Sequence, residues 1–146
     1  MALSWPLGSS VLLALVVVFL LPPGGTAPGV RDACTRTANE AAALLDLKLR
    51  FTTDDFIVHD AYVGPGYAIP TAASNEAIRL FAQTEALIID PVYTAKAAAA
   101  MIDHIRRGIV SRDDTVVFLH TGGTPALFAY HAEVAGALEK IPAEAG

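Results

Sequence analysis

The sequence predicts an α/β fold, a parallel β-sheet with flanking helices, and two features of the chain predict it. Apolar, β-branched runs occur at 56–58, 87–89 and 115–119, and segments with helical spacing of apolar residues lie between them. Strands and helices that alternate in this order are typical of βαβ units with right-handed crossovers. The run 115–119 (TVVFL) is apolar almost throughout, as expected for a strand that a parallel sheet buries on both faces.

Each predicted helix has a recognisable pattern or boundary. An amphipathic stripe of alanine and leucine predicts the first, Ser74 or Asn75 can cap the second, and Asp90 followed by a proline predicts the start of the third. Gly108 should terminate that third helix, which is expected to bury Ile102 and Ile105. Pro125 should open the fourth. The predicted ranges are 31–49, 75–85, 91–107 and 126–137.

Composition excludes several classes of protein. The chain has 146 residues and a formal net charge of −5, which fits one domain and argues against a nucleic-acid-binding surface. Cys34 is the only cysteine, so neither an intrachain disulfide nor a cysteine-rich zinc site is expected. The four histidines lack the close spacing of a helical metal site, and no metal is predicted.

The N-terminal segment 1–30 differs from the body of the chain, 31–146. Its residues 11–21 are uncharged and apolar, but no lysine or arginine precedes Arg31 and the run is shorter than the ~20 residues of a membrane span. The segment fits an export signal or anchor, a buried core element, or a wrongly started reading frame. We expect a cytoplasmic protein, with export or anchoring through 8–21 as the alternative.

Two loops are candidates for a ligand site. Ligands of open α/β sheets bind beyond the carboxyl ends of the strands, and segments 90–94 and 120–124 follow two predicted strands. Each feature also has an ordinary explanation. Asp90 can be an N-cap, the His-Thr-Gly-Gly sequence from His120 can be a tight turn, and Tyr67 and Tyr93 can be packing residues.

Taken together, the motifs resemble one family. In order they are Val-Gly-Pro-Gly-Tyr at 63–67, Glu-Ala-Ile-Arg-Leu at 76–80, Asp-Pro-Val-Tyr-Thr at 90–94 and Phe-Leu-His-Thr-Gly-Gly at 118–123. Over 62–130 the chain resembles the D-cysteine desulfhydrase and 1-aminocyclopropane-1-carboxylate deaminase family. These are fold-type II pyridoxal-phosphate enzymes, similar to the tryptophan synthase β-subunit. The resemblance therefore implies that residues 31–146 are the C-terminal part of such a domain.

The resemblance assigns roles to five residues. Tyr67 matches a catalytic tyrosine that lies over substrate and cofactor, and Tyr93 matches a second one that contacts the substrate. Thr94, Thr121 and Gly122 match cofactor-binding positions, Thr94 facing the pyridine ring. The implied cofactor is pyridoxal 5′-phosphate, and the implied substrate is a small amino acid.

The two threonines distinguish activities within the family. Ring-opening deaminases of the family carry glutamate and leucine at the positions of Thr94 and Thr121, whereas desulfhydrase-like members carry small hydroxyl residues. A carboxylate beside the pyridine nitrogen keeps it protonated and strengthens the electron sink, while a neutral hydroxyl gives a weaker sink. The resemblance thus favours elimination of sulfide from D-cysteine, giving pyruvate and ammonia, over cyclopropane opening. A deaminase-like fragment is the alternative.

Part of the family pattern is not found in this chain. The family needs a lysine that holds the cofactor covalently and a Ser/Gly/Thr-rich loop that binds its phosphate. None of the three lysines, Lys48, Lys96 and Lys140, has the expected surroundings. We therefore expect a fragment that is inactive alone, of an enzyme that is a homodimer when complete. A companion chain could supply the missing half. The rival hypothesis is a non-catalytic, secreted or membrane-tethered α/β module.

Overall fold

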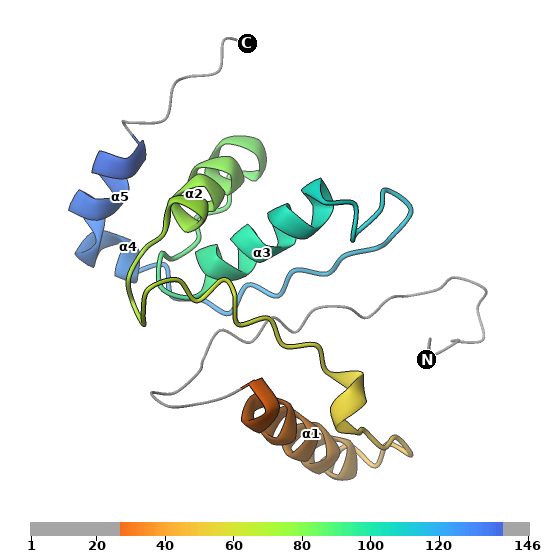
Figure 1. Cartoon of the computed structure of the whole chain (residues 1–146). Helices are drawn as coiled ribbons and strands as arrows, with labels where there is room; N and C mark the ends of the chain where they lie inside the picture. Colours follow the sequence, from red (N-terminus) through yellow and green to blue (C-terminus); the bar gives the residue numbers. More distant parts are fainter. Residues whose placement is uncertain (1–26, 139–146) are drawn as a thin grey trace. The chain divides into compact units, whose positions relative to one another are not determined.

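A computed structural model of the chain describes residues 27–138, which fall into two compact units. Within the described residues, the first unit comprises 27–60 and 113–117, and the second comprises 61–112 and 118–138. Figure 1 shows the helices of both. The apolar run at 11–21 lies outside the described residues, and so do the predictions made for it.

The first unit consists of helix α1 (Ala27–Leu44) and the short 3₁₀ helix η1 (Thr53–Asp55). The side-chain amide of Asn39 joins the segment before η1 to α1, because it donates to the carbonyl of Phe51 at 3.0 Å and accepts from the Phe51 N–H at 2.9 Å. Helix α1 begins four residues earlier and ends five residues earlier than the predicted helix 31–49. Asp46 is left-handed (φ 53°), and Leu47 N–H closes the helix end on the carbonyl of Ala42.

The second unit is built on the packing of α2 (Ala72–Glu85) against α3 (Thr94–Arg106), with α4 (Ala126–Ala129) and α5 (His131–Leu138) following. Alanines of α3 let the two helices approach closely, and α5 contributes Val134. Phe118 packs edge-on against Phe81 of α2, with ring centroids 5.3 Å apart. The buried core residues are Ala77, Ile78, Phe81, Ile89, Ala95, Ala98, Ala99, Ile102 and Val134.

Helix α2 ends at Glu85 as predicted, but its N-cap differs from the predicted one. Thr71, rather than Ser74 or Asn75, is the N-cap: its hydroxyl accepts from Ser74 N–H at 3.1 Å, and the Ser74 hydroxyl accepts from Thr71 N–H at 2.8 Å. Ser74 therefore completes a reciprocal capping box from inside the first turn. At the other end Ala86 adopts a left-handed conformation (φ 55°), which glycine adopts at far lower cost.

Helix α3 confirms the predicted stop signal and corrects the predicted start and buried face. It begins at Thr94, with Tyr93 as its N-cap, rather than at Pro91. Gly108 (φ 69°) follows its last turn and donates to the carbonyl of Ile105 at 3.0 Å. Ile102 is buried as predicted, but Ile105 is 49% exposed, because the buried face is formed by Ala95, Ala98, Ala99 and Ile102. The predicted single helix after Pro125 is divided at Tyr130 into α4 and α5.

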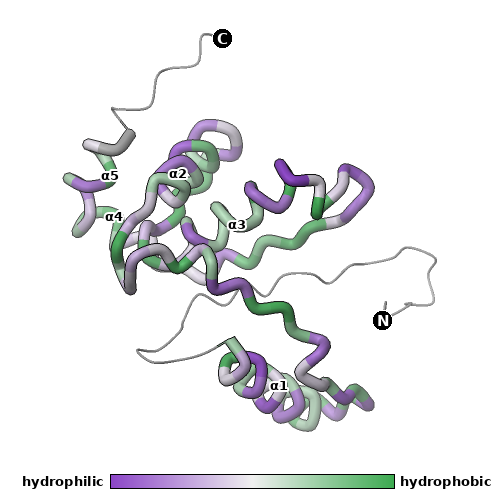
Figure 2. Tube along the Cα trace, in the orientation of Figure 1, coloured by the Kyte–Doolittle hydropathy of each residue, from purple (hydrophilic) through white to green (hydrophobic). Residues whose placement is uncertain are grey.

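The predicted β-sheet is not formed within residues 27–138, where no strand occurs. The apolar runs 56–58, 87–89 and 115–119 are irregular or extended connections, visible as mostly green stretches in Figure 2. A strand is defined by backbone hydrogen bonds to a neighbouring strand, and none of these runs has such a neighbour here. Val117 and Leu119 are accordingly 67% and 78% exposed.

No helix among residues 27–138 has the length and apolar character that crossing a bilayer requires. The apolar segment 8–21 lies outside this range.

The left-handed alanine after α2 generates a prediction. Ala86→Gly should stabilise the chain by about 0.5–1 kcal/mol, because relief of the left-handed strain exceeds the extra entropy of the unfolded glycine. Urea unfolding followed by circular dichroism measures the change.

The matched control is Ala82→Gly, inside the same helix, where glycine should destabilise by about 1 kcal/mol. If both substitutions changed the free energy of unfolding in the same direction, the left-handed conformation of Ala86 would be contradicted.

Candidate functional site

A single carboxylate organises the start of α3. Asp90 Oδ1 accepts hydrogen bonds from the N–H groups of Val92 (2.9 Å) and Tyr93 (2.7 Å), and Oδ2 accepts from the N–H of Thr94 (2.9 Å). Asp90 is fully buried, as expected only when such a group is well bonded. The carboxylate thus partners N–H groups that the beginning of a helix would otherwise leave unsatisfied.

The His-Thr-Gly-Gly turn lies directly against this carboxylate. Gly123 (φ +91°) is so close that a Cβ there would lie 2.7 Å from Asp90 Oδ2. The Thr124 hydroxyl donates to the carbonyl of Ile88 at 3.2 Å and holds the same turn to the segment before Asp90. The structure therefore brings together segments 90–94 and 120–124, the two loops that the sequence singled out.

His120 is part of this turn, and its hydrogen bonds define its tautomer. The N–H of Gly122 donates to Nδ1 at 3.0 Å, so Nδ1 carries no proton. Nε2 lies 3.1 Å from the carbonyl of Ile88, to which a protonated Nε2 donates. The ring therefore links two backbone segments.

The two candidate catalytic tyrosines meet. The hydroxyls of Tyr67 and Tyr93 are hydrogen-bonded, and their ring centroids lie 5.9 Å apart. The hydrogen bond to Tyr67 is the main cause of the raised pKa of the Tyr93 phenol. Tyr67 is 62% exposed, so the pair lies at the surface of the second unit.

The candidate cofactor-binding residues differ in what their polar groups already contact. The buried Thr94 hydroxyl donates to Asp90 Oδ2 at 2.5 Å and accepts from Asp90 N–H at 2.8 Å. The Thr121 side chain is exposed and forms no hydrogen bond within residues 27–138. Gly122 (φ +93°) is also exposed, and a Cβ there would meet nothing within 4 Å. Thr121 and Gly122 are thus open to a ligand, whereas Thr94 is committed to the helix cap.

Lys96 is buried in the second unit, although its local sequence did not predict burial. It is 3% exposed, and its Nζ donates to the carbonyls of Val63 at 2.6 Å and Gly66 at 3.0 Å. Burial lowers the pKa of the ammonium. Its partners lie 33 and 30 residues away in sequence, so no local pattern could have revealed them.

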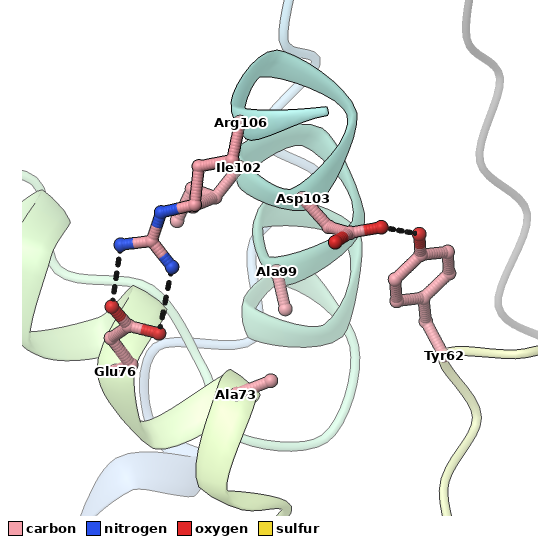
Figure 3. A pocket seen from close by; sticks show the side chains of 7 residues that line it. All are labelled: Tyr62, Ala73, Glu76, Ala99, Ile102, Asp103 and Arg106. Atoms are coloured by element: carbon pink, nitrogen blue, oxygen red, sulfur yellow. Dashed lines mark hydrogen bonds and ion pairs between the residues drawn. The ribbon is translucent and has the colours of Figure 1, made fainter. Parts of the chain in front are cut away.

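A separate cluster of charged residues lies between α2 and α3 (Figure 3). Arg106 bonds both carboxylate oxygens of Glu76, at 2.6 and 3.2 Å, and the Tyr62 hydroxyl donates to the carboxylate of Asp103. The bond to Asp103 raises the pKa of Tyr62, and the same bond lowers that of Asp103. These residues line a cavity of about 160 Å³ to which none of the five predicted site residues contributes. The lining residues are Tyr62, Ala73, Glu76, Ala99, Ile102, Asp103 and Arg106.

Comparison with known families decides the identity of the chain at the family level. A family model described as pyridoxal-phosphate dependent enzyme matches residues 18–122, more than half of the chain. The chain belongs to this family. Pyridoxal phosphate is accordingly the cofactor that membership implies.

Individual relatives of this pyridoxal-phosphate family agree. D-cysteine desulfhydrases of Salmonella newport (strain SL254) and Salmonella heidelberg (strain SL476) are 48% identical over 82 residues, covering 56% of this chain and 25% of each relative. The crystal structure of an ACC deaminase homologue superposes with a TM-score of 0.61 at 29% identity, covering 73% of this chain and 31% of that one. The chain therefore has part of the fold-type II fold and spans about a quarter of the length of the curated relatives it matches.

The described residues fit one side of a pyridoxal-phosphate site. An open glycine backbone and an exposed threonine hydroxyl at 121–122 can approach a planar ring, and the tyrosine pair supplies phenols beside the same helix start. Among residues 27–138, Lys96 donates only to backbone carbonyls, and Lys48 is exposed in the first unit. The same residues contain no group of three His, Cys, Asp or Glu side chains that could hold a metal ion.

The contact between Gly123 and Asp90 generates a prediction. Gly123→Ala should destabilise the chain by about 1–3 kcal/mol more than Gly122→Ala, because only the former Cβ overlaps a buried carboxylate. Both glycines have a φ near +90°, so the backbone strain is common to the two variants.

The free energy of unfolding of both variants, measured in urea, tests the difference. Equal losses would mean that the turn does not lie against Asp90.

Proposed function

We propose that the chain is the substrate-facing part of a pyridoxal-phosphate-dependent lyase that eliminates sulfide from D-cysteine. With one water consumed, the products are pyruvate, hydrogen sulfide and ammonia. The observation that carries the proposal is the cluster around Asp90, which joins the tyrosine pair to the open Thr121–Gly122 turn. The 48% identity to D-cysteine desulfhydrases supports this activity over others of the family.

Each residue of the cluster receives a role in this proposal. Bound pyridoxal phosphate would supply an electron sink for the charge that develops at the substrate α-carbon. Thr121 offers the pyridine nitrogen a neutral hydroxyl, and Gly122 lets the backbone approach the ring. Tyr67 and Tyr93 bind and orient the substrate, and the hydrogen bond between their hydroxyls keeps the two phenols in one arrangement.

Thr94 receives an indirect role, which differs from the one its sequence position suggested. Its hydroxyl proton already lies in a bond to Asp90, so it has no donor left for a pyridine nitrogen. In this proposal Thr94 fixes the cap that places Tyr93, and Thr121 alone presents a donor to the ring.

The proposal also covers the architecture of the complete enzyme. Segments 87–89 and 115–119 become strands of a parallel sheet once neighbouring strands of the domain are present, which agrees with their apolar, β-branched sequence. On the family resemblance, the complete enzyme is a cytoplasmic homodimer. Its covalent lysine and phosphate loop come from outside the segments described here.

The chain alone should not bind the cofactor covalently. After incubation with pyridoxal phosphate and borohydride reduction, peptide mapping should find no lysine labelled stoichiometrically, since Lys96 is buried and donates to two carbonyls. Lys48 is exposed in the first unit and has no glycine-rich sequence beside it. A single fully labelled lysine would contradict this expectation.

The activity is tested in a complete enzyme. Residues 62–130 should replace the matching segment of a Salmonella D-cysteine desulfhydrase, and the chimera should release sulfide from D-cysteine faster than it releases ammonia from 1-aminocyclopropane-1-carboxylate. Thr121→Val, which keeps the shape and removes the hydroxyl, should reduce kcat/KM for D-cysteine about tenfold, a loss of about 1.4 kcal/mol in transition-state stabilisation.

Thr84→Val is the matched control, because Thr84 is an exposed residue of α2 that donates only to the carbonyl of Leu80. It should leave sulfide release unchanged. A chimera that prefers the cyclopropane substrate would overturn the desulfhydrase assignment, and equal activities of Thr121→Val and the unmodified chimera would overturn the role of Thr121.

A further inference from the structure

Lys96 joins two parts of the second unit that are distant in sequence. It lies in the first turn of α3, three residues after Tyr93, and its Nζ donates to the carbonyls of Val63 and Gly66 in the loop before α2. Within residues 27–138 it has no carboxylate partner. Burial of an ammonium group is costly unless it is hydrogen-bonded, so these two carbonyls are what stabilise the side chain in this position.

The loop that Lys96 binds is the one that carries Tyr67. Gly64 (φ +74°) lies so close to Thr71, the N-cap of α2, that a Cβ would be 2.5 Å from the Thr71 methyl group. The loop is thus fixed at one end on α2 and, through Lys96, on α3. Tyr67 directly follows Gly66, and its hydroxyl reaches Tyr93 in the turn that leads into α3.

We propose that Lys96 is a positioning residue that holds the 63–66 loop against α3 and thereby keeps the Tyr67 hydroxyl on Tyr93. The inference rests on the proposed function only in assigning the tyrosine pair to the substrate. The geometry itself requires neither cofactor nor substrate.

The chemistry of the side chain suits this task. Both the ammonium and the neutral amine carry at least two N–H donors, so Lys96 can bind both carbonyls in either protonation state. The tether therefore persists when phenols are titrated at high pH. Methionine preserves much of the length and volume of lysine but donates nothing, so Lys96→Met removes the two bonds with little change in packing.

The test follows the phenols by NMR in the complete 146-residue chain labelled with ¹³Cζ-tyrosine. In Lys96→Met the upward shift of the Tyr93 pKa should be lost to the same extent as in Tyr67→Phe, which removes its main cause. Lys48→Met, at an exposed lysine of the first unit, should leave Tyr93 unchanged. The methyl signals of Ile78 and Ile102, buried between α2 and α3, verify that each variant is folded.

Two outcomes would overturn the proposal. One is a folded Lys96→Met chain in which the Tyr93 phenol titrates as in the unmodified chain. If the Lys96→Met variant loses its core methyl signals, the test is made on the unmodified chain by reductive methylation and mass spectrometry. Lys96 should then be methylated on the order of tenfold more slowly than Lys48, because a buried amine reacts only when the structure opens locally. Equal rates would exclude the tether. Neither measurement uses cofactor or substrate, so its failure is distinct from failure of the proposed activity.

Discussion

The structure of the second unit depends on the placement of one buried carboxylate. Asp90 bonds the N–H groups of Val92, Tyr93 and Thr94, and its other side is covered by Gly123. Burial of a charge is tolerated only when its oxygens are fully bonded, so the chain around Asp90 has little freedom. The start of α3, the direction of Tyr93 and the path of the 120–124 turn are all consequences of this one requirement.

Features encoded by neighbouring residues could be predicted from the sequence. Gly108 signalled the end of α3, and Asp90–Pro91 signalled its start to within three residues, because caps and terminators act within one turn. The proximity of segments 90–94 and 120–124 followed from the expected order of elements. The predicted α2 cap, Ser74 or Asn75, lies three or four residues too late, because Ser74 resembles an N-cap residue but acts here as the N3 partner of Thr71.

Features that depend on distant residues could not be predicted. Lys96 has the same local surroundings as any helical lysine, and only its bonds to Val63 and Gly66 distinguish it. The runs 87–89 and 115–119 have strand-like sequences, yet a strand requires a neighbour to bond to. The fold family of the chain and the local conformation of these runs are therefore separate questions, and the sequence motifs answered only the first.

Apart from Phe118, the run 115–119 is exposed, and this affects how the chain behaves in solution. Leu119 is 78% exposed, and the backbone of 116–119 forms no hydrogen bond within residues 27–138. An apolar extended segment with open donors and acceptors is a template for pairing with another chain. The residues that make this segment suitable for the interior of a sheet also favour its association with other copies of the chain. Self-association therefore competes with pairing of the segment in a sheet whenever the segment is left uncovered.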